Sequence, residues 1–284
     1  MIKVNEVSVE GNPDCVTVYE DGYVVSTYTL NKETGEKKGS LLYFEDHQIK
    51  AEVLVDKGIL DTKVIDNKLV SCCSDGGLLV TDKDRILSNT QLTESCCSYL
   101  DFNSSSIFCP SLDGTLHIID RCTLNLTSLP LNPYEIWYTA CTETLLFIPI
   151  SIGKLQVKDL RTMETVSLIT LHESEISSII PQEHQVFCGS FDGHISTTDL
   201  RINRKVCTSD IGGGVWRIKL YQNKFLTANM EEGFKYTSNS ELISLIPTES
   251  LAYGLGQVSD SLFIGCSFYD SKLFHLCFPL VSNH

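Results

Sequence analysis

Three aromatic side chains occupy equivalent positions in the second half of the chain. Trp137, Trp216 and Tyr253 each lie 16 to 18 residues before the glycine or serine of the next predicted turn. Three acidic residues stand near them in the sequence: Glu135, Glu173 and Glu249. Aromatic faces and carboxylates together attract organic cations, through the ring quadrupole and through charge. The pattern also fits a second interpretation, in which each ring only packs against the neighbouring structural unit.

Several familiar catalytic signatures do not occur in the sequence. It has no GxSxG nucleophile elbow, no HExxH motif and no phosphate-binding glycine loop, so the run Gly212–Gly214 predicts only a close backbone approach. The adjacent cysteine pairs at 72–73 and 96–97 point to opposite faces of a strand, which disfavours chelation. We therefore expect no metal site and no cofactor. The twelve cysteines are expected to be reduced and buried.

A recurring hairpin pattern predicts the elements that hold these residues. Its clearest copy is CGSFDGHISTTDLR at 188–201, with an Asp-Gly turn between two alternating strands. The turn residues are Gly22, Gly76, Gly114, Gly153, Gly193, Gly233 and Ser271, at spacings of 54, 38, 39, 40, 40 and 38. A period of about 40 residues is typical of β-propellers with four strands per blade. We predict an all-β, seven-bladed propeller of the WD40 type, as a single domain over residues 1–284.

The two ends of the chain predict how the ring closes. Residues 1–44 are expected to supply the first blade, and residues 49–90 and 91–131 the second and third. The long first interval contains the polar segment 31–38, which we interpret as a loop insertion. Little chain remains after Phe278 for a fourth strand in the last blade. We therefore expect Ile2–Val7 to complete that blade, because closure removes the free edges.

Composition restricts the functional class. The net charge of −14 disfavours nucleic-acid binding, which needs a basic surface. It suits a basic or cationic partner, and equally plain solubility. The chain starts without an apolar signal sequence, and no apolar run approaches the roughly 18 residues that span a membrane. We expect a soluble, intracellular monomer that does not bind membranes.

The hairpin pattern resembles the WD-repeat family. In that family a histidine before the innermost strand, a serine in the second strand and an aspartate in the following turn are linked by hydrogen bonds. His172, Ser190 and Asp192 match these positions, and Thr198 stands where the family has tryptophan. The resemblance implies a structural role for His172, and a general base is the alternative.

Stretches between residues 130 and 278 resemble one WD-repeat family, the diphthine methyl ester hydrolases of diphthamide biosynthesis. They are GGVWRIK at 213–219, SLAYG at 250–254, CSFYD at 266–270, and the segments 135–137 and 229–235. The resemblance implies a cytoplasmic carboxylic ester hydrolase, also named diphthine methyltransferase, that acts on elongation factor 2. It would demethylate methylated diphthine, a modified histidine, to give diphthine for the final amidation. The substrate carries a trimethylammonium group beside its ester.

The resemblance places a substrate site at the mouth of the propeller. We expect Trp137, Trp216 and Tyr253 to surround the ammonium group. Tyr269 and Asp270, in the last hairpin turn, are expected to face the same mouth.

The catalytic roles are hypotheses that follow from the needs of ester hydrolysis. One group must activate water, and we assign this to His172 or Glu135. Another must stabilise the oxyanion, and the candidates are Arg217 and the backbone N–H groups of Gly213 and Gly214. The alternative to an enzyme is a non-catalytic WD-repeat adaptor, with a flat mouth and rings buried between blades.

Overall fold

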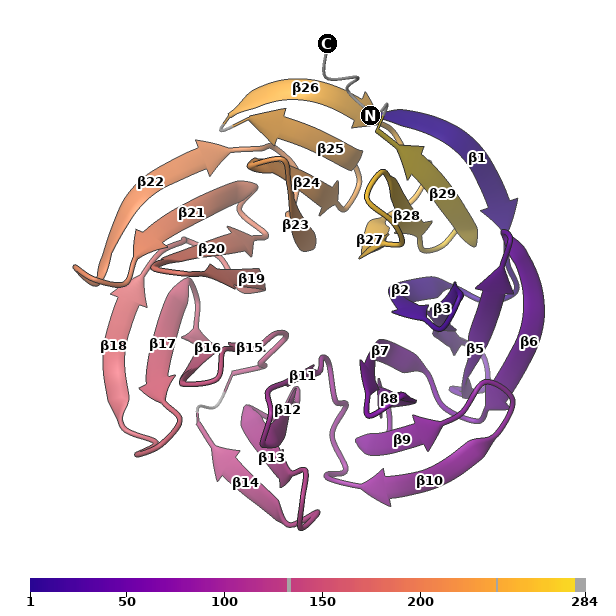
Figure 1. Ribbon diagram of the computed structural model, residues 1–284, viewed down its shortest axis with the longest axis horizontal. Coiled ribbons are helices and arrows are strands. Elements are labelled where there is room, and N and C mark those ends of the chain that lie inside the picture. Colours follow the sequence, from indigo (N-terminus) through magenta and orange to yellow (C-terminus); the bar gives the residue numbers. More distant parts are fainter. Residues whose placement is uncertain (132–133, 239, 279–284) are drawn as a thin grey trace.

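The computed structural model describes residues 1–131, 134–238 and 240–278. Seven antiparallel sheets are arranged as blades around a central axis (Figure 1). Within the described ranges the chain forms no helix, and so none long and apolar enough to cross a membrane. The predicted all-β, seven-bladed propeller is confirmed.

The first four blades run from the innermost strand outward. Blade one contains β2 (Pro13–Tyr19), β3 (Gly22–Thr27), β5 (Lys37–Glu45) and β6 (Gln48–Val55), with the short β4 (Thr29–Leu30) beside β5. Blade two contains β7 (Ile59–Ile65), β8 (Lys68–Cys73), β9 (Gly77–Thr81) and β10 (Ile86–Gln91). Blade three contains β11 (Asp101–Phe102), β12 (Ser106–Pro110), β13 (Thr115–Asp120) and β14 (Leu126–Pro130). Blade four contains β15 (Ala140–Cys141), β16 (Leu145–Ser151), β17 (Lys154–Asp159) and β18 (Thr165–Thr170).

The remaining blades follow the same order. Blade five contains β19 (Ile176–Gln182), β20 (Gln185–Ser190), β21 (His194–Asp199) and β22 (Arg204–Asp210). Blade six contains β23 (Arg217–Tyr221), β24 (Lys224–Asn229), β25 (Gly233–Ser238) and β26 (Glu241–Ile246). Blade seven contains β27 (Ala252–Gln257), β28 (Leu262–Ser267), β29 (Lys272–Cys277) and β1 (Ile2–Ser8).

Blade seven therefore closes with the first strand of the chain, as predicted. β1 pairs antiparallel with β29, from Ile2 opposite Cys277 to Ser8 opposite Lys272. Lys272 also contacts the Glu6 carboxylate at 3.0 Å. The two ends of the sequence are thus joined within one sheet, which leaves no open gap in the ring (Figure 1).

The core lies between the blades. The second and third strands of a blade are apolar on both faces because neighbouring blades cover both, whereas the outer strands face solvent. Phe234 of blade six packs in one cluster with Phe263 and Phe274 of blade seven. By contrast, all six residues of β10 are exposed.

The cysteines are free thiols and only half of them are buried, so burial was predicted too broadly. Cys122 and Cys207 are exposed, on the turn and outer strand of their blades. Cys72 and Cys73 are both fully buried but pack in different clusters, as opposite faces of a strand require.

The predicted boundaries of blade one are wrong. The turn at Gly22 joins the first and second strands of its blade, whereas the turns from Gly76 onward join the second and third. The equivalent turn in blade one contains Gly35, and 76 − 35 gives a spacing of 41 residues. The segment 31–38 is therefore that hairpin turn and not an insertion. An Asp-Gly turn suits both ends of a blade, so the motif alone did not distinguish them.

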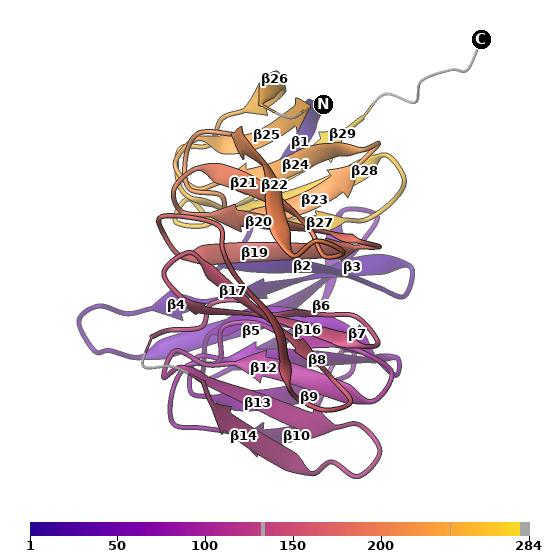
Figure 2. The same cartoon turned by 90° about the vertical axis from the view of Figure 1, so that its left-hand side faces the viewer.

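The same correction moves one strand. β6 pairs with β5 and forms the outer strand of blade one, so blade two begins at Ile59 and not near residue 49. The hairpin of β4 and β5 extends beyond the other turns on its side of the disc (Figure 2). Tyr28 and Lys37, at the base of this hairpin, line the cavity described below.

Candidate ligand site at the mouth of the propeller

A cavity of about 310 Å³ opens at one end of the central axis. Half of its wall consists of aromatic side chains from blades one, four, six and seven: Tyr28, Trp137, Trp216, Tyr253, Phe268 and Tyr269. The other half comes from blades one to three and includes the cationic Lys37: Asp14, Lys37, Leu60, Ser74, Cys96 and Leu112. The three rings that the spacing singled out therefore meet at one cavity. Tyr28, which lies between β3 and β4, was not among the predicted site residues.

Trp216 is the centre of an aromatic stack. Its ring lies parallel to Tyr253, with centroids 4.7 Å apart, and to Phe191, with centroids 5.7 Å apart. Phe268 lies on the far side of Tyr253, with centroids 4.8 Å apart and its ring tilted by 44°. Trp216 is only 8% exposed, so its faces are already covered by protein. It supports the cavity wall, and the half-buried Trp137, at 6.0 Å from Trp216, offers more surface to a ligand.

Asp14 supplies a carboxylate that the sequence prediction did not include. It begins the innermost strand of blade one, is 5% exposed and lines the same cavity as Trp137. Burial raises the pKa of Asp14 from 3.8 to about 7; Arg217 opposes this shift, and Asp61 adds to it. The sequence prediction did not identify β2 as the innermost strand of blade one. With that assignment, Asp14 would have been expected at the mouth, beside the start of β27.

Arg217 lies on the axis beside the cavity. Its guanidinium stacks on the Trp216 ring at 4.8 Å and on Tyr99 and Tyr138 at 5.2 and 5.3 Å. It donates hydrogen bonds to the backbone oxygens of Trp216 and Ser177. Arg217 therefore touches the wall of the cavity from behind and does not line it.

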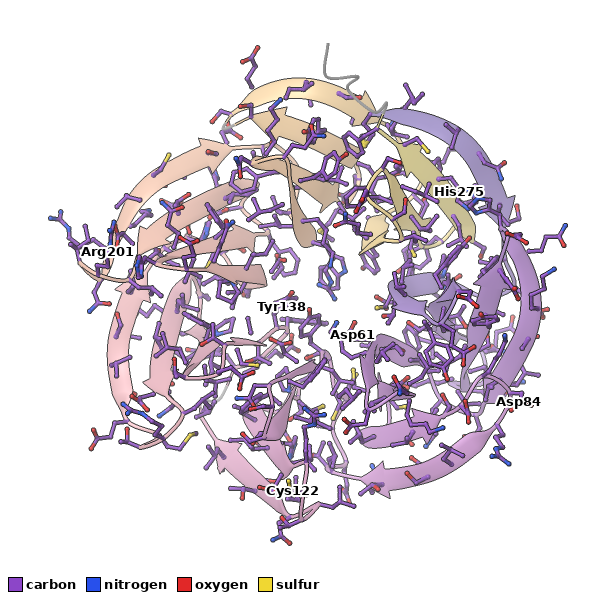
Figure 3. All side chains as sticks on the ribbon, in the orientation of Figure 1. Asp61, Asp84, Cys122, Tyr138, Arg201 and His275 are labelled. Carbon is purple, nitrogen blue, oxygen red and sulfur yellow. The ribbon has the colours of Figure 1, made fainter. Side chains whose placement is uncertain are left out.

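Asp61 and Tyr138 lie close to the centre of the ring (Figure 3). The Asp61 carboxylate accepts hydrogen bonds from Lys63 Nζ at 2.7 Å, from the Leu100 backbone N–H at 3.1 Å and from Cys15 Sγ at 2.9 Å. Both of its oxygens thus accept hydrogen bonds from the protein, unlike those of Asp14.

Glu135 lies in an adjoining pocket. It is exposed and lines a hollow of about 270 Å³ together with Trp137 and Glu175, between blades four and five. Trp137 lines both this hollow and the mouth cavity and so separates them.

Tyr269 and Asp270 are divided between two hollows. Tyr269 is 64% exposed and lines the mouth and a neighbouring acidic groove, whereas Asp270 lines only the groove, with Glu231 and Glu249. Both Asp270 carboxylate oxygens are buried and have no hydrogen-bond partner among the described residues.

Gly213 and Gly214 do not line the mouth cavity. Their loop is held from behind, because Lys235 Nζ donates to the Gly212 carbonyl at 3.0 Å and Asn229 Nδ2 donates to it at 2.6 Å. The close backbone approach was predicted at the mouth, where the structure does not place this run; Gly212 and Gly213 have positive φ angles and lie against the side chains of Lys235 and Glu232.

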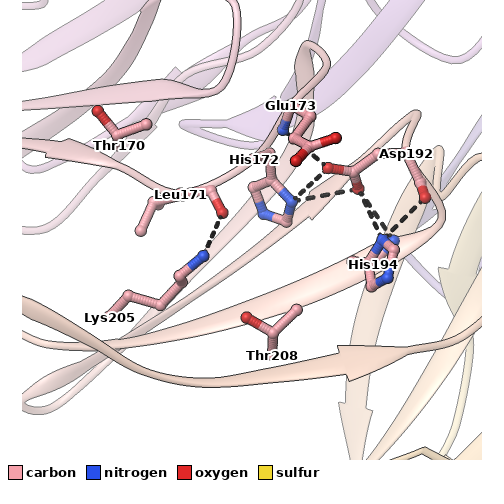
Figure 4. A pocket seen from close by; sticks show the side chains of 8 residues that line it. All are labelled: Thr170, Leu171, His172, Glu173, Asp192, His194, Lys205 and Thr208. Atoms are coloured by element: carbon pink, nitrogen blue, oxygen red, sulfur yellow. Dashed lines mark hydrogen bonds and ion pairs between the residues drawn. The ribbon is translucent and has the colours of Figure 1, made fainter.

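His172 is built into the scaffold and lies outside the mouth (Figure 4). Its Nδ1 lies 3.1 Å from Asp192, and Nε2 lies 2.8 Å from the Ser196 hydroxyl and 3.0 Å from the Cys188 carbonyl. Burial lowers the pKa of His172. Both ring nitrogens are engaged, which agrees with the structural interpretation. Ser196 of β21 takes the place predicted for Ser190.

Comparison with known proteins gives two curated relatives, although no family model matches the chain. It is 24% identical, over an alignment of 378 positions including gaps, to a protein of Saccharomyces cerevisiae named diphthine methyltransferase, covering 95% of this chain and 96% of that protein. It is 27% identical, over an alignment of 278 positions including gaps, to a Dictyostelium discoideum protein named diphthine methyltransferase homolog, covering 77% of this chain and 76% of that protein. These similarities confirm the family resemblance that the motifs indicated.

A solved structure supports the fold alone. A chain in the crystal structure of the mitotic checkpoint complex superimposes with a TM-score of 0.81 at 14% identity. The match covers 98% of this chain and 94% of that chain.

Proposed function

From the similarity to the two proteins named diphthine methyltransferase, we propose that this chain acts in diphthamide biosynthesis. We propose in particular that it hydrolyses the methyl ester of methylated diphthine on elongation factor 2, in the cytoplasm, giving diphthine and methanol. The observation that supports this most directly is the mouth cavity, where aromatic rings and a buried carboxylate lie together.

The cavity suits the end of one modified side chain. A volume of about 310 Å³ is at the small end of the range for ligand pockets. The quaternary ammonium group would contact Trp137 and Tyr269, which are the more accessible rings, while Tyr253 and Trp216 form the wall behind them. The Asp14 carboxylate supplies a negative charge in a site of reduced dielectric, where its attraction for a cation is stronger than in water.

The catalytic assignments change with this geometry. Arg217 does not line the cavity and so is not proposed to donate to the oxyanion; it stays a candidate only for stabilising negative charge through its own charge, from behind the Trp216 ring. Glu135 stays a candidate that would act from the adjoining hollow. We do not propose His172, Gly213 or Gly214, because hydrogen bonds or position keep them from the cavity.

A second candidate function is methyl transfer, which the names of the two relatives favour. A sulfonium methyl donor is also a cation and would suit the same rings. A third is the adaptor role, in which the mouth only docks a partner.

Mass spectrometry of methylated elongation factor 2, incubated with the purified protein, separates the three. Hydrolysis predicts loss of one methyl ester and release of methanol with no added cofactor. Methyl transfer predicts a gain of methyl on unmethylated substrate only when S-adenosylmethionine is present. No mass change under either condition contradicts both enzyme functions and favours the adaptor.

A further inference from the structure

The mouth cavity contains one carboxylate that the protein leaves without a donor. Asp14 is 5% exposed, yet no described residue donates a hydrogen bond to its side chain. Buried carboxylates normally receive such bonds, because an unsatisfied charged group is strongly unfavourable in the interior. Asp61, on the same axis, shows the usual arrangement with three donors. Asp14 is therefore kept free at the wall of a cavity.

The groups around Asp14 hold it between two opposing charges. Arg217 favours its ionised form and Asp61 disfavours it, and burial disfavours it most strongly. The cationic Lys37 lines the same cavity. The other titratable groups that interact with Asp14 are uncharged at neutral pH: Tyr28, Tyr253, Cys96 and Cys266. Burial, with a smaller contribution from Asp61 and against the effect of Arg217, raises the pKa of Asp14 to about 7, where both protonation states are populated near neutrality.

We propose that Asp14 is the general base that activates water for ester hydrolysis at this mouth, an inference that rests on the proposed function. It lines the cavity with the rings expected to hold the ammonium group, and the ester is bonded next to that group. Water bound between carboxylate and ester would therefore be in reach of both. A carboxyl group that titrates near the working pH is suited to accept and return a proton.

The steps balance without a cofactor. The Asp14 carboxylate takes a proton from water while the water oxygen bonds to the ester carbonyl carbon, which gives a tetrahedral oxyanion and a protonated Asp14. The bond from that carbon to the methoxy oxygen then breaks, and protonated Asp14 donates its proton to the departing methoxide, which leaves as methanol. The product carboxylic acid releases one proton to solvent, and Asp14 is again a carboxylate.

The test is the pH profile of Asp14→Asn on methylated elongation factor 2. In the wild-type protein, kcat/KM should fall about tenfold for each pH unit below about 7, because the base must be ionised. D14N should lower kcat by roughly 10²- to 10⁴-fold and abolish this dependence. Asp61→Asn should shift the fall of kcat/KM to lower pH, because removal of the like charge lowers the pKa of Asp14.

A second readout excludes misfolding as the cause. Because the folded protein raises the pKa of Asp14 above 3.8, its ionisation destabilises the folded state as pH rises from about 4 to 7. D14N should therefore unfold at a higher temperature than wild type at pH 8 while losing activity. Replacement of a residue with only a structural role would lower both the unfolding temperature and the activity.

Two failures are distinguishable. If the wild-type protein hydrolyses the ester, and D14N keeps the wild-type rate and the fall of kcat/KM at low pH, Asp14 is not the base, although the proposed function stands. If Glu135→Gln loses this pH dependence instead, the base is Glu135. If the wild-type protein leaves the ester intact, the proposed function is wrong and the role of Asp14 falls with it.

Discussion

At the scale of single residues, Trp216 both packs inside the protein and lines the mouth cavity. Its ring is stacked between Phe191 and Tyr253 and covers the Arg217 guanidinium. Its indole Nε1 is buried without a hydrogen-bond partner in the described part of the chain. The stack therefore depends on the ring and gains nothing from the N–H group.

We predict losses of stability of different size for two substitutions at this position. Trp216→Ala should lower the free energy of unfolding by about 3–5 kcal/mol, because it empties the centre of the stack. Trp216→Phe keeps an aromatic ring and removes the unsatisfied donor, so it should lower the free energy of unfolding by far less. Chemical denaturation measures both. Equal losses would show that the indole N–H matters and that the stack alone does not explain the residue.

Trp137 should behave differently, because it is half-buried and borders two hollows. Trp137→Ala should change stability by less than Trp216→Ala and raise KM roughly tenfold, since a cation–π contact contributes about 1–2 kcal/mol. Steady-state kinetics on methylated elongation factor 2 check this. An unchanged KM would place the ammonium group away from this ring.

At the scale of secondary-structure elements, the junction of blades one and seven depends on a buried histidine. His275 of β29 is 1% exposed, and its Nε2 lies 3.3 Å from the Tyr23 hydroxyl of β3. The His47 ring lies 4.4 Å away, on the turn between β5 and β6. Burial, and then His47, lower the pKa of His275 to about 4.

This junction should weaken in acid. The folded-state pKa of about 4 is below the unfolded value of 6.5, so protonation favours the unfolded chain. The contribution is complete above pH 6.5 and is lost as pH falls toward 4, by up to about 3 kcal/mol. His275→Gln should flatten the stability profile over this interval in urea titrations.

His47→Gln is the matched control, because it leaves the buried ring in place and removes only the neighbouring charge. Its loss of stability between pH 6.5 and 4 should be smaller than that of wild type. Identical acid profiles for all three proteins would assign the acid sensitivity to other groups.

At the scale of the whole molecule, ring closure rests on one strand. β1 is the outer strand of blade seven and pairs with β29, while the following chain continues into blade one. Its residues are mostly exposed, so its contribution comes from the ladder and from covering an edge more than from buried area.

Deletion of residues 1–8 should lower the unfolding temperature by roughly 5 °C or more and promote aggregation through the bare edge of β29. A peptide with the sequence of residues 1–8 should restore part of the stability, and a scrambled peptide should not. Differential scanning calorimetry and light scattering measure the two effects. A truncated protein that unfolds and scatters like the full chain would show that closure by β1 is dispensable.

The sequence by itself determined the propeller, because turn chemistry and strand alternation are local and recur with a fixed period. It determined that Ile2–Val7 closes the ring, since the last blade was one strand short. It also identified Trp137, Trp216 and Tyr253, because equivalent positions in a repeat lie at equivalent places. The turn at Gly22 misled, because the local signal does not say which end of a blade a turn occupies.

Only the tertiary structure decided what those residues do. In the folded protein, Trp216 is stacked inside the wall of the cavity, and both ring nitrogens of His172 are hydrogen-bonded within the scaffold. Glu135 lines a different hollow. It also brought Asp14, more than 120 residues before Trp137, to the mouth. Burial, and the charges that face a group across the ring axis, are set by packing between blades that are distant in sequence. The pKa of Asp14 is therefore a property of the closed ring and not of its own segment.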